Sequence, residues 1–355
     1  MNVFDKLRLI RDVIQQDVGN RGLARDPHDN LINACPDDFA NACGIIATTP
    51  EPMLAIVTGF HIPSASPPAS ETDGPLGALF LARALWAQGT RAGILTDGTA
   101  MLAMVGGLKE LNLAETIPIE ELVEAEDSDD SDRHESVLEK CPICGSEMRR
   151  RTHRFGTFLS CAQYPACSGE LDSLTNTLHR LTASKSPLSS NCQLIAIERV
   201  GPSKKDGRCY TMRGRDVTAD THSVDPLFDS YSVTTIGIGD GGNEIGMGKI
   251  PHETIVKNIP NGDLIHCRVS TDYLIVAGVS NWGAYALAAG VALLRGVDLP
   301  DELFDPDRER AILQTMVDAG PLVDGVTGQQ TATVDGLSWE QYIAPLLRIR
   351  EIMKM

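Results

Sequence analysis

The stretch Val233–Lys249, VTTIGIGDGGNEIGMGK, is the most informative part of this sequence. Its first six residues carry no charge and are rich in β-branched side chains, which predicts a buried strand that ends at a turn. The glycines from Gly237 onward let the backbone adopt positive φ angles and approach a ligand closely. Successive N–H groups in such a loop can bind an anion, and the carboxylates of Asp240 and Glu244 can bind a metal or move a proton. The stretch predicts a reaction site at the end of a strand.

Four further segments have the composition of buried strands, and a helix separates the first two. The strands are predicted at Leu54–Phe60, Ala92–Thr96, Leu194–Ile197 and Leu274–Val279. Pro75 is placed for the first turn of the intervening helix and Gly89 for the position after its end. Strand, helix and strand in this order predict an α/β fold with a mostly parallel sheet layered with helices.

The composition excludes several functional classes. The 355 residues carry a formal net charge of −17, which argues against general affinity for nucleic acid or anionic membranes. Apolar runs stay well short of the roughly 18 residues that cross a bilayer. The amphipathic N-terminal stretch, predicted to be helical over Met1–Val18, contains acids and fits neither a secretory signal nor a transit peptide. We therefore expect a cytoplasmic protein with no membrane partner.

A change of composition divides the chain. Residues 120–135 contain nine carboxylates and one arginine, which predicts a solvated acidic linker at 121–139. A small zinc ribbon is predicted to follow at 140–172. The flanking parts, 1–120 and 180–355, then form one α/β domain. Gly19–Asp29 is polar and turn-rich, and the tail from about Pro300 is predicted to be helical, with no motif that indicates chemistry.

The predicted ribbon rests on two cysteine pairs. Sixteen residues separate Cys144 of the first pair, Cys141 and Cys144, from Cys161, and five residues separate Cys161 from Cys167. Four thiolates at this spacing suit a structural, tetrahedral Zn²⁺. The segment CPICGSEMRRRTHRFGTFLSCAQYPACSG resembles the zinc ribbons of bacterial type I DNA topoisomerases, which bind single-stranded DNA. Basic and aromatic residues suit such contacts, so a weak single-stranded nucleic-acid contact is a further hypothesis; the residues are Lys140, Arg149, Arg150, Arg151, Arg154, Phe155, Phe158 and Tyr164.

Acidic residues gather just after the predicted strands. Asp97, Glu198 and Asp240 each follow a strand, and the carboxyl ends of parallel strands share one edge, where ligands bind in open α/β sheets. Glu71, Asp73, Asp97 and Asp240 have the oxygen ligands that Mg²⁺ or Mn²⁺ prefers. Arg213 and Arg215 suit a substrate carboxylate or phosphate.

The glycines of the first stretch also match a dinucleotide-binding pattern, Gly237-x-Gly239-x-x-Gly242. That pattern requires a helix to begin at once. Here the residues after Asn243 are broken by glycine and stopped by Pro251, so nucleotide redox chemistry is disfavoured.

Five segments together resemble the C-terminal cyclase domain of the D-glutamate cyclase family. They are GFHIPSASPPASETDGPLGALFLARAL, LIAIERVG, YTMRGRD, TTIGIGDGGNEIGMGK and VAGVSNWGAYAL. The resemblance spans about Leu54 to Leu294 apart from the insert, and it implies conversion of D-glutamate to 5-oxo-D-proline and water, an α/β fold and a divalent metal. Two departures are the missing additional N-terminal domain of the vertebrate mitochondrial form and the inserted ribbon.

On this resemblance, the motif residues receive roles as a hypothesis. Asp240 or Glu244 would act as base or as metal ligand beside Glu71 and Asp73, with Asp97 in support and Asn243 in the same catalytic loop. N–H groups of Gly239, Gly241 and Gly242 would stabilise an oxyanion. Arg213 and Arg215 would hold the α-carboxylate, and Asn281 would orient the amine. Two alternatives stay open: a divalent-metal-dependent phosphatase acting on small phosphomonoesters, and a nucleic-acid-binding adaptor organised by the ribbon.

Overall fold

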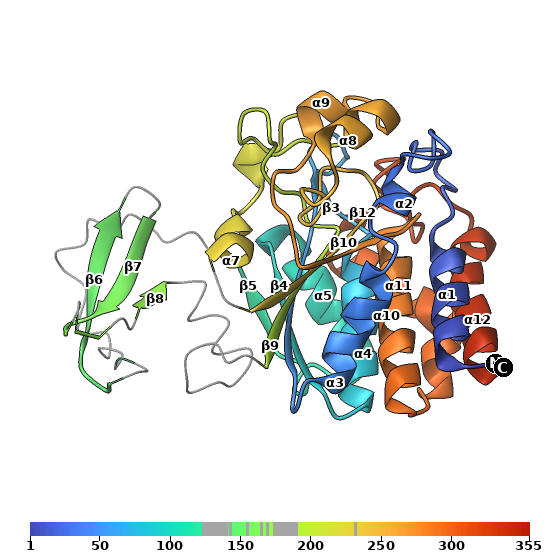
Figure 1. Ribbon diagram of the computed structural model, residues 1–355, viewed down its shortest axis with the longest axis horizontal. Coiled ribbons are helices and arrows are strands. Elements are labelled where there is room, and N and C mark those ends of the chain that lie inside the picture. The colour runs from blue at the N-terminus through green and yellow to red at the C-terminus, as the bar shows by residue number, and fades with distance from the viewer. Residues whose placement is uncertain are drawn as a thin grey trace.

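The structure is a computed structural model of the chain, and its main body is one parallel sheet layered with helices (Figure 1). It describes residues 1–122, 141, 144–153, 156–163, 166–167, 170–172, 191–230 and 233–355. The predicted linker at 121–139 lies outside these residues from position 123 onward. The predicted division of the chain into domains stays a prediction.

Six strands form the main sheet in the order β11-β10-β9-β1-β4-β5, and every neighbouring pair is parallel. The predicted α/β fold with a mostly parallel sheet is therefore confirmed. The strands are β1 (Met53–Thr58), β4 (Arg91–Thr96), β5 (Ile119–Glu121), β9 (Cys192–Ile197), β10 (Thr234–Gly239) and β11 (Tyr273–Val276).

Both faces of this sheet are buried, as expected for parallel strands. In β1, Leu54 and Ile56 face the larger of two cores, while Ala55 and Val57 face the other. Helices cover the larger core, and residues of α7, α8 and α9 belong to the other core. In Figure 1, α8 and α9 lie above the upper ends of the strands. The helices are α1 (Val3–Ile14), α2 (Leu31–Ala34), α3 (Asp38–Thr48), α4 (Pro75–Ala87), α5 (Gly98–Glu110), α7 (Asp225–Ser230), α8 (His252–Asn258), α9 (Gly262–Ile265), α10 (Ser280–Arg295), α11 (Pro306–Ala319) and α12 (Trp339–Lys354).

Helix ends follow the chemistry of their residues. Pro75 occupies the first turn of α4, as predicted, and Gly89 follows its end with a φ of 74°. The predicted N-terminal helix is shorter than Met1–Val18, because α1 ends at Ile14. Two 3₁₀ turns, η1 (Thr218–Asp220) and η2 (Asp301–Phe304), complete the helical elements of the described residues.

A second, small sheet joins distant parts of the chain. It comprises β2 (His61–Ile62), β3 (Ala69–Glu71) and β12 (Leu322–Val323), in the order β12-β3-β2. The third sheet, β6 (Met148–His153), β7 (Gly156–Cys161) and β8 (Glu170–Asp172), is antiparallel and belongs to the predicted ribbon.

Candidate active site and cysteine cluster

The glycine-rich loop is closed by its own acid. β10 ends at Gly239, and Asp240 follows at the carboxyl edge of the sheet. The Glu244 carboxylate accepts hydrogen bonds from the backbone N–H groups of Asp240 (3.0 Å) and Gly242 (2.8 Å). Gly242 has a φ of 97°, and glycine adopts this value without strain. Two of the loop N–H groups that could bind an anion therefore already donate to Glu244.

Asp73 binds the N-terminus of α10. Its carboxylate accepts from the backbone N–H groups of Ser280 (2.9 Å), Asn281 (2.8 Å) and Gly74 (3.0 Å). A carboxylate at this position is favoured by the unsatisfied N–H groups and the dipole of the helix. The structure thus places Asp73 firmly at the carboxyl edge of the sheet.

Asn281 is occupied by contacts within the protein. Its side-chain oxygen accepts from the N–H groups of Gly74 (2.9 Å) and Gly77 (2.6 Å) at the start of α4. Its side-chain nitrogen donates to the Thr72 carbonyl (3.3 Å) and the Tyr342 hydroxyl (3.1 Å). The amide therefore joins α4, α10 and α12 beside Asp73.

Six buried carboxyl groups gather around this edge. Oxygens of Asp73, Asp240 and Asp335 lie within 4.8 Å of one another, and so do oxygens of Glu198, Asp240 and Glu244. We call these the aspartate triad and the glutamate triad; Asp240 belongs to both. The sixth is Glu71, whose carboxylate lies against Gly325. All six residues are at most 7% exposed.

Burial changes the acidity of this cluster. Loss of solvation raises the pKa of Asp240 to about 6 and that of Asp335 to about 7, while the Arg21 guanidinium acts in the opposite direction. Burial followed by repulsion from neighbouring carboxylates holds the pKa of Asp73, Glu71 and Glu198 well above their usual range. Carboxyls that exchange protons near neutral pH are typical of acid–base sites.

Arg21 is the cation that enters this cluster. Its guanidinium contacts the carboxylates of Asp240 and Asp335, the latter at 2.5 Å, and only 13% of its side chain is exposed. One guanidinium cannot neutralise so many carboxyl groups if all are ionised. The site therefore favours a further cation, protonated carboxyls, or both.

Glu198 holds a strained backbone conformation within the cluster. Its φ is 45°, which is uncommon for a residue other than glycine. Its carboxylate accepts a hydrogen bond from the Ser280 hydroxyl at 2.5 Å. A Cβ atom on neighbouring Gly74 would lie 2.8 Å from the Glu198 Cβ, so only glycine fits beside it. Strain of this kind often accompanies function.

The remaining predicted residues lie in different surroundings. Asp97 is buried but contacts Arg199 and His222, and Arg199 together with these hydrogen bonds lowers its pKa against the opposing effect of burial. The structure therefore does not bring Asp97 together with Asp73 and Asp240. Arg213 and Arg215 are exposed, and the Arg213 guanidinium donates to the Val326 carbonyl at 3.0 Å.

Asn243 completes the predicted catalytic loop. It is fully buried, and its side-chain nitrogen donates to the Tyr210 carbonyl at 2.8 Å. Its side-chain oxygen has no hydrogen-bond partner among the described residues. Gly241 lies against it, since an added Cβ would stand 2.7 Å from that oxygen.

The aspartate triad fits a divalent metal. Its donors are carboxylate oxygens, the ligands that Mg²⁺ and Mn²⁺ prefer. One Asp335 oxygen, Oδ2, is buried and has no hydrogen-bond partner in the described part of the chain. An unpaired buried oxygen is costly unless a proton or a cation occupies its lone pairs. Of the predicted set, Asp73 and Asp240 thus share a group that could hold an ion, together with Asp335, whereas Glu71 and Asp97 are not in that group.

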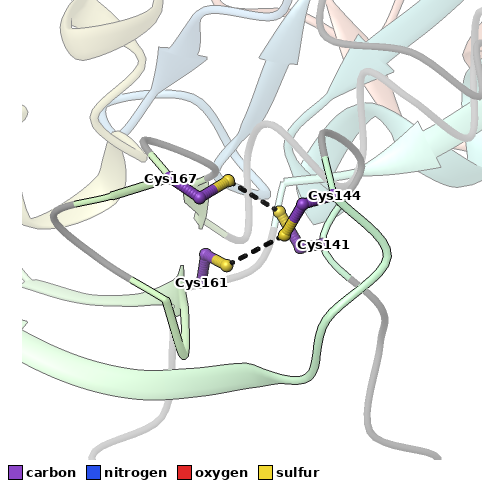
Figure 2. A group of neighbouring side chains, drawn as sticks. All are labelled: Cys141, Cys144, Cys161 and Cys167. Atoms are coloured by element: carbon purple, nitrogen blue, oxygen red, sulfur yellow. Dashed lines mark hydrogen bonds between the residues drawn. The ribbon is translucent and has the colours of Figure 1, made fainter.

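The four ribbon cysteines converge on a second, separate centre (Figure 2). The Sγ atoms of Cys141 and Cys167 are 3.6 Å apart, and those of Cys144 and Cys161 are 3.4 Å apart. Four sulfurs around one Zn²⁺ at about 2.3 Å stand roughly 3.8 Å from each other. The cluster can therefore bind a metal. Lys140, Arg154, Phe155 and Tyr164 lie outside the described residues.

Sequence comparison now identifies the family. A model of the family described as "D-glutamate cyclase-like, C-terminal" matches residues 10–350. This chain belongs to that family. A relative named "D-glutamate cyclase, mitochondrial" from Homo sapiens is 30% identical over 302 residues, which is 83% of this chain and 40% of the human protein. The D-glutamate cyclase-like chain thus spans about two fifths of that relative's length.

The compartment of this D-glutamate cyclase-like chain stays a prediction, because the name of the human relative refers to mitochondria. Within the described part of the chain, every helix is too short or too polar to span a bilayer.

The family identified from the five sequence segments is confirmed by the comparison, whereas the inserted ribbon is a feature that the comparison leaves open.

Two contributors to the site were missed by sequence reasoning. Arg21 comes from the turn-rich segment 19–29, and Asp335 comes from the tail, where no chemistry was expected. A weak signal existed for both: Arg21 precedes Gly22, Asp335 precedes Gly336, and both glycines have positive φ. Such a signal is too common in loops to identify a site.

Proposed function

We propose that this chain is a D-glutamate cyclase that converts D-glutamate to 5-oxo-D-proline and water. The observation that carries the proposal is the buried carboxyl cluster at the sheet edge, in a chain of the D-glutamate cyclase-like family. The reaction needs one group that accepts a proton from the substrate ammonium and another that donates a proton to the departing oxygen. Carboxyls with a pKa near 6 and near 7, side by side, can do both.

The chemistry can be written with these residues. Ionised Asp240 accepts a proton from the α-ammonium, and the freed amine attacks the γ-carboxyl carbon of the same molecule. A C–N bond forms, and a C–O bond breaks as the oxygen leaves as water. That oxygen takes one proton from a protonated carboxyl of the cluster, a role that we assign to Asp335 or Glu198, and one from the amine nitrogen. Holding the substrate folded makes the attack intramolecular, which removes much of the barrier.

A divalent ion in the aspartate triad, when bound, would neutralise the γ-carboxylate and make its carbon a better electrophile. The other steps fall to the protein. Glu244 keeps the loop closed, so that the position of Asp240 is fixed by the N–H bond to Glu244. Asn281 and Asp73 hold the N-termini of α4 and α10 against the same site.

The loop itself does not favour the phosphatase alternative, because the N–H groups of Asp240 and Gly242 that could bind a phosphate already donate to Glu244. The same carboxyl cluster could hold a divalent ion for hydrolysis of a phosphate ester, so a phosphate-release assay decides between the two reactions. The adaptor alternative depends on side chains outside the described residues and stays a prediction.

For the cysteine cluster, we propose that Cys141, Cys144, Cys161 and Cys167 bind a structural Zn²⁺, because four sulfurs converge at tetrahedral spacing.

The proposal is tested by NMR of D- and L-glutamate incubated with metal-analysed protein, with and without Mg²⁺ or Mn²⁺. We expect 5-oxoproline from the D isomer and not from the L isomer, with faster turnover when the ion is added. Turnover of neither isomer would contradict the proposed reaction. Release of phosphate from small phosphomonoesters by the same preparation would instead support the phosphatase alternative.

A further inference from the structure

Arg21 is presented to the site by a rigid turn. The Asp17 carboxylate accepts hydrogen bonds from three successive backbone N–H groups, those of Arg21 (2.8 Å), Gly22 (2.9 Å) and Leu23 (3.0 Å). Gly22 has a φ of 100°, and a Cβ atom there would overlap the Asn258 carbonyl. The turn is therefore packed against the C-terminal end of α8, whose last residue is Asn258, and the Arg21 side chain reaches the carboxyl edge of the sheet.

The guanidinium meets the same carboxylates that would bind an ion. It contacts Asp240 and Asp335, two members of the aspartate triad, whose side chains are only 2% and 3% exposed. The third member, Asp73, takes its hydrogen bonds from the N-terminus of α10. Arg21 does not complete the triad, because Oδ2 of Asp335 stays buried with no hydrogen-bond partner among the described residues.

We propose that Arg21 is an internal counter-ion that competes with a divalent cation for the carboxylates of Asp73, Asp240 and Asp335. An ion bound to these oxygens at about 2.0–2.5 Å would stand beside guanidinium nitrogens in contact with the same oxygens. Two positive charges at such a distance repel each other strongly in a buried site. The cation therefore displaces Arg21 when it binds. This inference deepens the proposed function, since it concerns the same site.

Competition of this kind has two consequences. Without the ion, Arg21 keeps the buried carboxylates from repelling one another and holds the site together. With the ion bound, the displaced Arg21 guanidinium becomes a free cation at the edge of the site, and the backbone turn that carries it does not need to move. The affinity of the carboxylates for the ion therefore depends partly on how strongly they bind Arg21.

The experiment measures Mn²⁺ binding to the full chain by electron paramagnetic resonance, which detects the free aqueous ion. The measurement is made at pH 8 on the wild-type protein and on Arg21→Gln, Arg21→Lys and Arg25→Gln. Arg25 is exposed and lies in the same turn-rich segment, so its variant loses the same charge outside the site. We expect Arg21→Gln to bind Mn²⁺ at least tenfold more tightly, Arg21→Lys to fall between, and Arg25→Gln to match wild type within twofold.

An unchanged or weakened Mn²⁺ affinity in a folded Arg21→Gln variant would overturn the inference, and so would the absence of Mn²⁺ binding in every variant. If Arg21→Gln does not fold, the Arg21→Lys variant decides alone. A lysine side chain is shorter and should compete less well for the carboxylates, so this variant should still bind Mn²⁺ more tightly than wild type does. The proposed function is judged separately by D-glutamate turnover. Tighter Mn²⁺ binding by Arg21→Gln, without D-glutamate turnover by wild type, would support the counter-ion role of Arg21 and contradict the cyclase proposal. D-glutamate turnover with an unchanged Mn²⁺ affinity in Arg21→Gln would support the cyclase proposal and contradict the counter-ion role.

Discussion

Asp240 is the residue on which the two carboxyl triads depend. It contributes an oxygen to each, contacts Arg21, and has its backbone N–H fixed by Glu244. In the proposed reaction, its side chain is the group that takes the proton from the substrate amine. A change at this one position tests the proposed chemistry more directly than any other.

Asp240→Asn should lower D-glutamate turnover by about 10²–10⁴-fold, the usual contribution of a general base. An amide has the same shape as the carboxylate but cannot accept the proton. The fold should persist, since the change removes a buried charge from an acidic cluster. Turnover by NMR and melting by circular dichroism check this, with exposed Asp298→Asn as the matched control. Full activity in Asp240→Asn would refute its role as base.

A pair of stacked histidines lies near the loop, and we expect it to give the protein a measurable pH response. The Nδ1 atoms of His252 and His266 are 2.9 Å apart, and Nε2 of His266 lies 3.0 Å from the Met247 carbonyl. A carbonyl only accepts, so Nε2 of His266 carries the proton and its Nδ1 accepts from His252. On the other side, Nε2 of His252 faces Asp263 at 3.5 Å. A second proton on His266 would break this arrangement.

Burial accordingly lowers the pKa of His266, and the sign of its effect on stability follows. Below pH about 6.5 the unfolded chain binds a proton that folded His266 binds less readily, so the free energy of unfolding falls as pH falls. The loss is at most about 1.4 kcal/mol per pH unit. Urea unfolding at pH 7.5, 6.5 and 5.5 should show a shallower decline in His266→Gln than in wild type. The exposed His28→Gln variant should show the same decline as wild type. If the free energy of unfolding of His266→Gln fell with pH as steeply as that of wild type, His266 would not be the source of the decline.

At the scale of elements, helices α4 and α10 cap each other beside the site. Asn281 of α10 accepts from Gly74 and Gly77, while Asp73, just before α4, accepts from Ser280 and Asn281. The close approach depends on Gly74, which has a φ of 91° and would place a Cβ atom 2.7 Å from the Thr58 hydroxyl oxygen. The geometry of the carboxyl edge is therefore set by hydrogen bonds from backbone N–H groups to side chains at the start of the two helices.

Gly74→Ala should destabilise the protein by more than about 2 kcal/mol, because backbone strain and steric overlap with Thr58 and Glu198 add to each other. Gly89→Ala is the matched control: its φ is also positive, at 74°, but nothing lies within 4 Å of an added Cβ. That variant should lose only about 1–2 kcal/mol. Urea unfolding measures both, and equal losses would show that crowding at Gly74 plays no part.

At the scale of the whole molecule, the α/β body and the cysteine cluster should act independently. Cys144→Ser should reduce bound zinc from about one ion per chain to less than half, because one of four thiolates is lost. D-glutamate turnover should stay within twofold of wild type. Elemental analysis and NMR check the two outcomes, with Cys35→Ser as the control outside the cluster. A matching loss of turnover would mean that the cluster supports the active site.

The same scale explains what could be predicted from the sequence. Strands such as β1 and β10 are readable because their own residues are β-branched and uncharged, and α4 is readable from Pro75 and Gly89. The small sheet is not, because β12 has two residues and pairs with β3 about 250 positions earlier. Arg21 and Asp335 meet for the same reason: tertiary contacts between the two ends of the chain bring them together, and no local pattern encodes that contact.

The order of the strands in the main sheet determines where the chain can take an insertion or be divided into two pieces. Strands β1, β4 and β5 come from before residue 122, and β9, β10 and β11 come from after residue 191; one six-residue ladder between β1 and β9 joins the two groups. Additional residues between the groups interrupt no ladder of the main sheet, and each doubling of such a connection adds only about 0.6 kcal/mol of closure entropy. A segment inserted at this point, such as the one that carries β6, β7 and β8, therefore leaves the pairing of the main sheet unbroken. Separate expression of residues 1–122 and 191–355 would show whether the ladder between β1 and β9 is enough to reassemble that sheet.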